Sequence, residues 1–482
     1  MQYPAEVQAR VLKELLLQGK YCQYGKQHQF ASIKDWKGYS KLPFLSYEDI
    51  KGDINKMMHG EKNILWPGEV EWFAKSSGTT NDKSKFIPVP KVNLRNCHVK
   101  ASWDSVSIIY HNNPDARIFA DKSLIMGGSI ERLPAHPKTK YGDVSAIMLH
   151  NMPSVGRPFY TPDFDTAILP NFDEKIEKMV KICSKENVTM IGGVPTWTIV
   201  LFRKILEATG KSNILEIWPN LKVYSHGGVS FEPYRKQFKT FLPSDDIIYM
   251  EFFNASEGWF GSQLYPEDEG MLLLLDNNIY YEFIPSSDWH KDHPTVVPLE
   301  GVEKGINYAM VISTNAGLWR YKLGDTVRFT CTNPYKIKIT GRTEQFINAF
   351  GEEVMVANTD KALSETCKKT NAVVTEYTVA PIYFNGNQKG GHEWIVEFEK
   401  DPHGSLDMFT ENLDKNLQRL NSDYEAKRYK DMALSKLKLK AVPKGTFYSW
   451  MKSKGKIGGQ HKVPRLANHR KYIDDIRRFI KL

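Results

Sequence analysis

Residues 173–206, DEKIEKMVKICSKENVTMIGGVPTWTIVLFRKIL, decide the fold class of this chain. Four apolar residues of the first half fall on one helical stripe, namely Ile176, Met179, Val180 and Cys183. The short apolar segment 188–194 follows and predicts a buried strand, and Pro195 suits the first turn of the next helix. The stretch therefore predicts a helix, a strand and a second helix over 196–206.

The same alternation continues on the C-terminal side of this stretch. Residues 221–225 and 247–252 have the β-branched and aromatic character of strands, and a helical segment from about 232 to 241 separates them. Residues 1–60 show helical spacing with connecting turns. Helices and strands that alternate with short connections predict an α/β domain in which helices cover the sheets.

The pattern changes to strands after Gly261. Segments 271–275 and 279–283 flank Asp276-Asn277-Asn278, which has the residues of a turn and predicts a β-hairpin. Segments 308–313 and 325–330 are further strand candidates. We expect these segments to form a smaller, mainly antiparallel β layer.

A domain boundary is expected between Gly341 and Gly351. Beyond it, strand candidates 373–379, 394–399 and 437–441 alternate with a helix expected from about 407 to 428. This is an α+β unit of domain size. We therefore predict a large N-terminal domain, residues 1–345, and a small α+β C-terminal domain, residues 346–482.

Composition narrows the class of protein. The 482 residues carry a net charge of +9, and the segment from Lys427 to the end has 17 Lys and Arg against 3 acids. A solvated face explains most of this surplus, and no nucleic-acid-binding motif accompanies it. We see no signal peptide and no apolar run that can span a bilayer. The five scattered cysteines predict reduced thiols in a cytoplasmic protein.

The strongest local signal for function is the run Ser76-Ser77-Gly78-Thr79-Thr80, which follows a short strand candidate and is followed by Lys85. Glycine allows a ligand close to the backbone, hydroxyls donate to anionic oxygens, and lysine supplies charge. These groups suit a phosphate chain at the carboxyl end of a strand. The open alternative is an ordinary surface loop rich in Ser, Thr and Gly.

Three later segments carry further candidate residues. Gly228 lies in a glycine pair between a strand and a helix, where the backbone can approach a ring or a phosphate. Phe253, Ser256 and Glu257 combine an aromatic ring, a hydroxyl and a carboxylate at a strand end, a set that can bind a base and Mg²⁺. Each of these segments also has an ordinary explanation as a tight turn or as core aromatics.

The third segment contains Asp325, placed at the expected start of a strand after Gly324, where a carboxylate can accept two hydrogen bonds from ribose hydroxyls. Asp325 can equally organise the turn. Arg342 lies downstream and offers a permanent cation for a phosphate or carboxylate, or an ordinary surface charge.

Taken in order, these segments resemble the adenylate-forming (ANL) superfamily and, more closely, the auxin-responsive promoter family of Gretchen Hagen-type acyl acid–amido synthetases. The likeness rests on 76–80 with Lys85, on 253–257 and on 318–325. Two more runs resemble family segments, residues 191–197 and 459–465. The resemblance covers nearly the whole chain.

The resemblance implies an enzyme that activates a carboxylic acid with ATP and Mg²⁺ as an acyl-adenylate and transfers the acyl group to an amine or amino acid. It implies that phosphate is held by Ser76, Ser77, Gly78, Thr79, Thr80 and Lys85. Glu257 would bind Mg²⁺, Ser256 would lie near the α-phosphate, and Phe253 and Gly228 would face the adenine. Asp325 would hold the ribose and Arg342 would lie at the domain hinge.

Lys462 is the candidate for stabilising charge during adenylation, and its ordinary explanation is one more solvated lysine. The chain departs from the family pattern at Asp82, where a glycine is usual, and at Phe253, where a tyrosine is usual. Two alternatives stay open: an acyl-CoA ligase that shares the first half-reaction, and a non-catalytic nucleotide-binding relative. No nucleic acid or membrane partner is expected.

Overall fold

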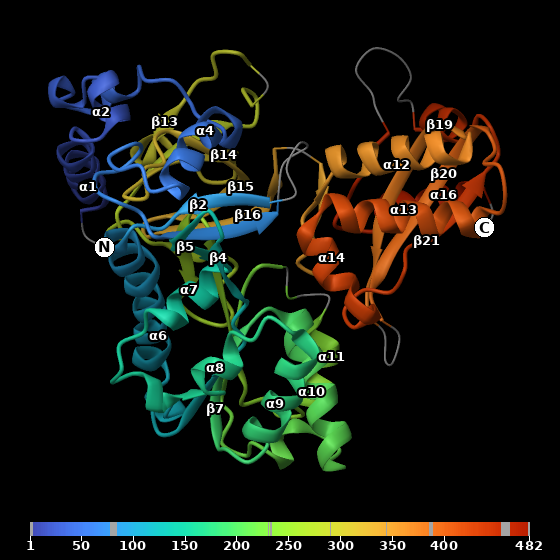
Figure 1. The fold of residues 1–482 in the computed structure, drawn as a ribbon, viewed down its shortest axis with the longest axis horizontal. Helices are drawn as coiled ribbons and strands as arrows, with labels where there is room; N and C mark the ends of the chain where they lie inside the picture. Colours follow the sequence, from blue (N-terminus) through green and yellow to red (C-terminus); the bar gives the residue numbers. More distant parts are fainter. Residues whose placement is uncertain are drawn as a thin grey trace.

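The computed structural model describes residues 3–77, 84–229, 231, 234–289, 291–343, 345–384, 389–454 and 463–480. Within these ranges nothing is described of five side chains, those of Ser77, Phe172, Thr196, Lys236 and Ala357. Figure 1 shows a large part that contains the N-terminus and, beside it, a smaller C-terminal part in orange and red. The expected mixed α/β architecture with a large N-terminal and a small C-terminal unit is confirmed.

A ladder of twelve strands forms the centre of the large part, in the order β13-β12-β14-β15-β16-β11-β10-β9-β8-β7-β3-β6. The first half of these strands in sequence comprises β3 Lys122–Ile125, β6 Tyr160–Thr161, β7 Val188–Gly193, β8 Val223–His226, β9 Ile248–Ala255 and β10 Gly258–Gln263. The second half comprises β11 Met271–Leu273, β12 Ile279–Pro285, β13 Val297–Pro298, β14 Asn307–Thr314, β15 Tyr321–Thr332 and β16 Tyr335–Arg342.

One side of this ladder is parallel and the other antiparallel. Strands β6, β3, β7, β8 and β9 pair in parallel, and β9 pairs antiparallel with β10. Because the parallel strands share a direction, their carboxyl ends meet at one edge of the sheet, where α/β folds bind ligands. The helices around this half are α6 Lys100–Asn112, α7 Val144–His150, α8 Phe164–Ala167, α9 Phe172–Cys183, α10 Pro195–Thr209 and α11 Arg235–Phe241.

A second, four-stranded sheet has the order β2-β1-β5-β4. Its strands are β1 Trp72–Ser77, β2 Ser84–Pro88, β4 Ile130–Leu133 and β5 His136–Gly142. The expected N-terminal helices are present as α1 Pro4–Gly19, α2 Gln23–Gln27, α3 Trp36–Tyr39 and α4 Tyr47–Met58, and the short α5 Lys91–Asn93 follows β2. β1 and β2 pair antiparallel, so the hydroxyl-rich segment begins inside a strand of this small sheet.

The hairpin predicted at 276–278 is wrong. β11 pairs with β10 and β16, whereas β12 pairs with β13 and β14, so the segment between them crosses to another place in the ladder. The reason lies in the partners of this connection: Gln8 donates hydrogen bonds to the carbonyls of Leu275 and Ile279, and the Asn277 side chain donates to Trp259 O. These contacts satisfy the polar groups that a hairpin would have paired locally.

The C-terminal part packs helices on a three-stranded sheet of order β19-β20-β21. Its elements are β17 Phe346–Ile347, β18 Val354–Met355, α12 Val356–Thr370, β19 Val373–Ile382, β20 Gly391–Lys400, α13 Leu406–Leu420, α14 Ser422–Arg428, β21 Lys438–Val442, α15 Thr446–Ser453 and α16 Lys471–Phe479.

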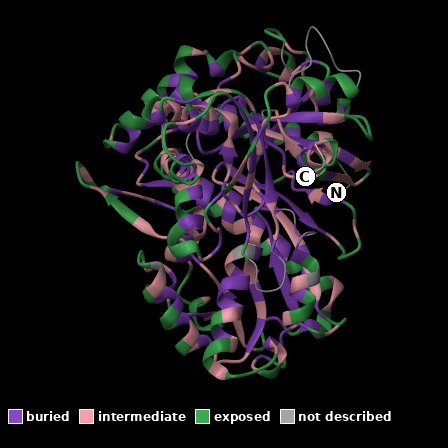
Figure 2. Cartoon of the chain, turned by 90° about the vertical axis from the view of Figure 1, so that its right-hand side faces the viewer, coloured by how far each residue is buried: buried purple, intermediate pink, exposed green. Residues whose placement is uncertain are grey.

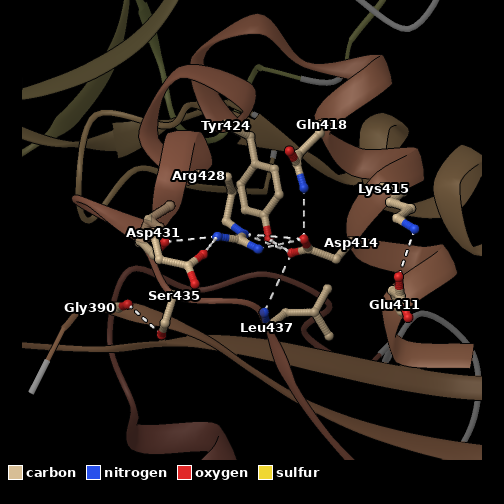
Figure 3. A network of polar contacts seen from close by, with 11 residues as sticks. Gly390, Glu411, Asp414, Lys415, Gln418, Tyr424, Arg428, Asp431, Ser435 and Leu437 are labelled. Atoms are coloured by element: carbon tan, nitrogen blue, oxygen red, sulfur yellow. Dashed lines mark hydrogen bonds and ion pairs between the residues drawn. The ribbon is translucent and has the colours of Figure 1, made fainter. Parts of the chain in front are cut away.

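The single helix predicted from 407 to 428 is two helices. Asn421 leaves helical geometry with φ −142° and ψ 117°, and its side chain caps α14 by accepting from Tyr424 N. Figure 3 shows the network that joins the two helices: Tyr424 and Arg428 of α14 both donate to Asp414 of α13. α14 is therefore fixed to the C-terminal part by a buried ion pair.

Buried apolar side chains run through the middle of the molecule, where the purple strands of Figure 2 lie. One apolar cluster joins the two parts. The rings of Tyr234, before α11, and Phe384, after β19, are 5.9 Å apart, and the Tyr234 hydroxyl donates to Ala349 O. The C-terminal part therefore rests on the helices that flank β8.

Candidate active site

A cavity of about 1280 Å³ lies at the carboxyl edge of the parallel strands and extends to the C-terminal part. It brings together predicted site residues that are far apart in the sequence. These are Ser76, Lys85, Gly228, Phe253, Ser256, Glu257, Asp325 and Arg342. The C-terminal part adds Asn348, Tyr383, Asp423 and Asn468 to the lining.

Five predicted residues cannot be placed in this way. Gly78, Thr79, Thr80 and Lys462 lie outside the described residues, and the Ser77 side chain is not described. Their assignment stays a prediction. The described residues nearest to them in sequence, Ser76 and Lys85, do line the cavity.

Ser76 and Lys85 form a cross-strand pair in the β1–β2 hairpin. Side chains of residues directly opposite each other in an antiparallel pair lie close together on the same face. The Lys85 ammonium lies 5.8 Å from the centre of the Tyr47 ring, a residue at the start of α4. A hydroxyl and a cation are thus presented together at the cavity wall.

Ser256 and Glu257 form the tight turn between β9 and β10. Glu257 is only 8% exposed, and burial raises the pKa of its carboxyl, whereas the nearby charges of Lys85 and Arg342 lower it. This carboxylate therefore shares the cavity wall with two cations whose charges act on it. Among the described residues, no group of three or more His, Cys, Asp and Glu side chains forms a ready-made metal site.

Asp325 lies within β15, opposite Arg342 of β16, and not at a strand start as the sequence predicted. The strand begins four residues earlier because Tyr321 already pairs with β14. The Asp325 carboxylate is 3.5 Å from Arg342 Nε, and Arg342 Nη1 is 3.6 Å from Glu353. Burial raises the pKa of Asp325, and the Arg342 charge lowers it.

The glycine pair after β8 allows close packing and a sharp turn. A side chain on Gly227 would come within 2.7 Å of Phe252, and Gly228 has a φ of +81°. The carbonyl of Gly228 accepts a hydrogen bond from Asn348 Nδ2 at 3.1 Å. The adjoining His226 is buried, and its Nδ1 has no partner in the described structure; burial lowers its pKa to about 3, so the ring is neutral.

Phe253 is both a core residue and part of the cavity wall. Its side chain is 7% exposed, and its ring centre lies 4.8 Å from that of Phe260. Phe253 therefore packs against a core ring and also lines the cavity, so its role in binding the adenine stays a prediction.

Sequence reasoning missed an apolar arm of the cavity. The residues that line it come mainly from α6, α7 and the loops beside β3 and β6, and they include Trp103, Val106, Phe119, Met148, Met152 and Val155. The rings of Trp103 and Phe119 lie 6.0 Å apart. The only sequence signal was the spacing of Val99, Trp103 and Val106 along one helical face, which does not say what that face contacts.

The fold is shared with adenylate-forming ligases of known structure. The acyl acid amido synthetase GH3.15 in complex with 2,4-DB matches with a TM-score of 0.63 at 17% identity, covering 99% of this chain and 94% of that one. A 2-hydroxyisobutyryl-CoA ligase in complex with 2-HIB-AMP and CoA matches with a TM-score of 0.59 at 14% identity, covering 100% and 92%. At such identities the likeness concerns the fold alone.

The family follows from the sequence models. The GH3 family N-terminal domain matches residues 1–247, the central domain residues 272–342 and the C-terminal domain residues 357–471. The chain therefore belongs to the GH3 family. It is similar to the indole-3-acetic acid-amido synthetase GH3.4 of Arabidopsis thaliana, with 24% identity over 96% of this chain and 89% of that protein.

No helix in the described part of the chain is long and apolar enough to cross a membrane. All five cysteines are free.

Proposed function

We propose that this GH3-family protein is an ATP-dependent ligase that converts a carboxylic acid to its acyl-adenylate and then transfers the acyl group to an amine, forming an amide. The observation that carries this proposal is a cavity lined by two kinds of residue. Hydroxyls, cations and carboxylates of the predicted site residues form one set, called the polar end here, and the aromatic and aliphatic side chains of the apolar arm form the other. An acid with an apolar tail and a nucleotide would meet between them.

The polar end fits ATP. Ser76 and Lys85, together with the undescribed Gly78, Thr79 and Thr80 and with Ser77, would hold the phosphates, because hydroxyls and a cation offset their charge. Ser256 would lie by the α-phosphate. Asp325 would accept from the ribose hydroxyls, and Phe253 and Gly228 would flank the adenine.

Mg²⁺ also fits this end, because it is commonly held by one or two carboxylates together with substrate phosphates, and Glu257 is a carboxylate at the cavity wall. When bound, it would neutralise charge that develops on the phosphates. Glu257 would keep that charge close to the turn between β9 and β10, where the Lys85 and Arg342 fields also act.

A change in the position of the C-terminal unit would separate the two half-reactions. We place its boundary at residues 345–346, next to Arg342 of β16, which contacts Glu353 across that boundary. Lys462, in the C-terminal unit, would come to the phosphates during adenylation. The five free cysteines agree with the reducing conditions of the cytoplasm.

The apolar arm supports an apolar acid as substrate. Its aromatic rim is partly exposed: Trp103 is 50% and Phe119 40% accessible, so a bulky tail can extend toward solvent. Burying such a tail contributes about 25 cal/mol per Å². A small or strongly charged tail would gain little there.

Pyrophosphate release tests the proposal. The protein is incubated with ATP, Mg²⁺ and a library of carboxylic acids, and the best acid is then offered with amines, amino acids or CoA. Acid-dependent release followed by amide formation supports the proposal. A thioester product would make the protein an acyl-CoA ligase, and no release with any acid would leave a non-catalytic nucleotide-binding relative.

A further inference from the structure

One face of α6 lines the cavity along most of the helix. The lining residues follow helical spacing and are Val99, which immediately precedes α6, and Ser102, Trp103, Ser105, Val106 and Ile109. At a rise of about 1.5 Å per residue, the stretch from Val99 to Ile109 spans about 15 Å. The cavity therefore follows α6 for roughly three helical turns.

The two ends of this face lie at different places on the central sheet. Near its N-terminal end, Ala101 packs in one apolar cluster with Trp259, which also lines the cavity and follows Glu257 and Gly258 in the chain. Near its C-terminal end, Ile109 packs in another cluster with Val223, the first residue of β8. Because Glu257 follows the carboxyl end of β9, which is parallel to β8, α6 runs back along the strands from the proposed reaction site toward their amino ends.

The lining face of α6 offers few polar partners to a ligand. Ser102 Oγ donates to Val99 O at 2.8 Å, and Ser105 Oγ donates to Ala101 O at 2.9 Å, so both hydroxyl hydrogens are used by the helix itself. The other side chains on this face are aliphatic or aromatic. A hydrocarbon tail is therefore well suited to this face, whereas a polar substituent would give up its water without gaining a donor in return.

The rest of the lining is adaptable and open. Met148 and Met152 belong to the apolar arm, and Met126 and Met190 also line the cavity. Methionine is unbranched and adjusts to irregular shapes, which suits a flexible chain that has no single shape. Val155, another residue of the arm, is 78% exposed, so the arm opens to solvent and does not end at a closed wall.

We propose that the acid activated in this cavity is an unbranched aliphatic carboxylic acid whose tail lies along α6. This inference rests on the proposed function, because it names the class of the first substrate of that reaction. The carboxylate would lie near the turn between β9 and β10, and the tail would extend toward Ile109. A chain of single bonds advances about 1.2 Å per bond, as the extended peptide backbone does, so the face of α6 accommodates a tail of about twelve bonds.

ATP–pyrophosphate exchange with a homologous series of acids tests the proposal on the wild-type protein. From butanoic to dodecanoic acid, kcat/KM for the acid should rise by about three- to fourfold for each methylene that is buried, and then level off as longer tails reach solvent. Dodecanoic acid should also exceed 1-naphthylacetic acid, which has the same number of carbon atoms in a compact and rigid shape. A kcat/KM that stops rising at or before octanoic acid, or that is higher for the naphthyl acid, overturns the proposal.

A pair of variants locates the tail. Val106→Trp places a large ring on the lining face, about 4.5 Å along the helix before Ile109. The ratio of kcat/KM for dodecanoic acid to that for butanoic acid should fall about a hundredfold, because roughly four methylenes lose their place. Ser107→Trp is the matched control, since Ser107 lies on the same helix, is exposed and does not line the cavity, and it should keep the wild-type ratio.

A Val106→Trp protein that exchanges pyrophosphate with the wild-type ratio would also overturn the proposal, and if this variant does not fold, the series on the wild-type protein decides alone. Exchange that is confined to short or aromatic acids would refute the aliphatic tail and leave the proposed function in place. Absence of exchange with every acid is a different result, and it would refute the proposed function itself.

Discussion

Two arginine–carboxylate pairs differ in how completely they are bonded: a buried pair of Arg320, just before β15, with Glu282 of β12, and a partly buried pair of Arg342 of β16 with Asp325 of β15. Arg320 and Glu282 make two hydrogen bonds at 2.9 and 3.0 Å, and Arg320 Nη1 also donates to the carbonyls of Ser40 and Leu42. Arg342 Nε lies 3.5 Å from Asp325 Oδ1. The first pair is 2% and 1% exposed, whereas the second lines the cavity.

The difference separates a structural pair from one that we propose to be functional. Glu282 has a third donor in Trp36 Nε1, so the Arg320 pair is saturated and fixes α3 and the segment after it to β12. Among the described residues, Arg342 makes one hydrogen bond, from Nη2 to Leu323 O at 3.2 Å, and it shares its charge between Asp325 and Glu353. Its unsaturated groups are available to a ligand.

The largest expected effect is on the saturated pair. Arg320→Met leaves the Glu282 carboxylate buried without its cation, so the free energy of unfolding should fall by about 3–5 kcal/mol. Urea denaturation measures this change in the free energy of unfolding. The double variant Arg320→Met with Glu282→Met should recover part of the loss; a single variant within about 1 kcal/mol of wild type would contradict the structural role.

A third buried cation, Lys175 of α9, extends the comparison to pH. It donates to Gly127 O and Gly128 O, and burial lowers its pKa to about 8 from an ordinary value near 10.5. Between these pH values the unfolded chain binds more protons, so the free energy of unfolding should rise with pH, by about 3 kcal/mol in all. Stability of the wild type relative to Lys175→Met should therefore increase from pH 8 to 10.5. A flat difference would mean that Lys175 titrates normally.

Substitutions in the Arg342–Asp325 pair should lower activity and leave the stability of the fold nearly unchanged. Asp325→Asn removes the proposed acceptor for the ribose hydroxyls, so kcat/KM for ATP should fall by about 10²-fold, while Arg342 keeps Glu353 and the unfolding midpoint stays close to wild type. Steady-state pyrophosphate release measures the first and urea denaturation the second. Asp276→Asn, an exposed partner of Lys100, is the control. A loss of several kcal/mol of stability would mean that Asp325, like Glu282, has a structural role.

The smallest effect is expected in the apolar arm. Trp103→Ala should lower kcat/KM for a bulky apolar acid about tenfold and leave a two-carbon acid unaffected, because only the larger tail reaches that ring. Tyr110→Ala is the matched control, since the Tyr110 ring centre lies 6.1 Å from that of Phe119 and Tyr110 does not line the cavity. Equal losses for both acids would mean that Trp103 acts on the fold.

The features that the sequence predicted correctly are those that depend only on residues close together in the chain. The spacing of Ile176 and Met179 and the position of Pro195 marked α9 and α10 because periodicity and fixed φ are properties of the segment itself. Strand pairing is not local, so the path from β11 to β12 was misread. The break at Asn421 was missed because a cap inside a helical pattern resembles a continuing helix.

The same distinction holds for the site. Ser76, Glu257 and Asp325 stand in short segments whose hydroxyl, carboxylate or glycine residues are recognisable in the sequence itself. Trp103 and Val106 lie inside an ordinary helix, and their role depends on what packs against that helix. Only the folded arrangement shows that both line a cavity.

Acid-dependent ATP–pyrophosphate exchange in the wild-type protein and in Glu257→Ala tests the central claim most directly. The account predicts exchange with at least one apolar carboxylic acid, and a Glu257→Ala protein that binds ATP but no longer exchanges pyrophosphate. Unchanged exchange in Glu257→Ala, or no exchange in the wild-type protein with any acid, would contradict it.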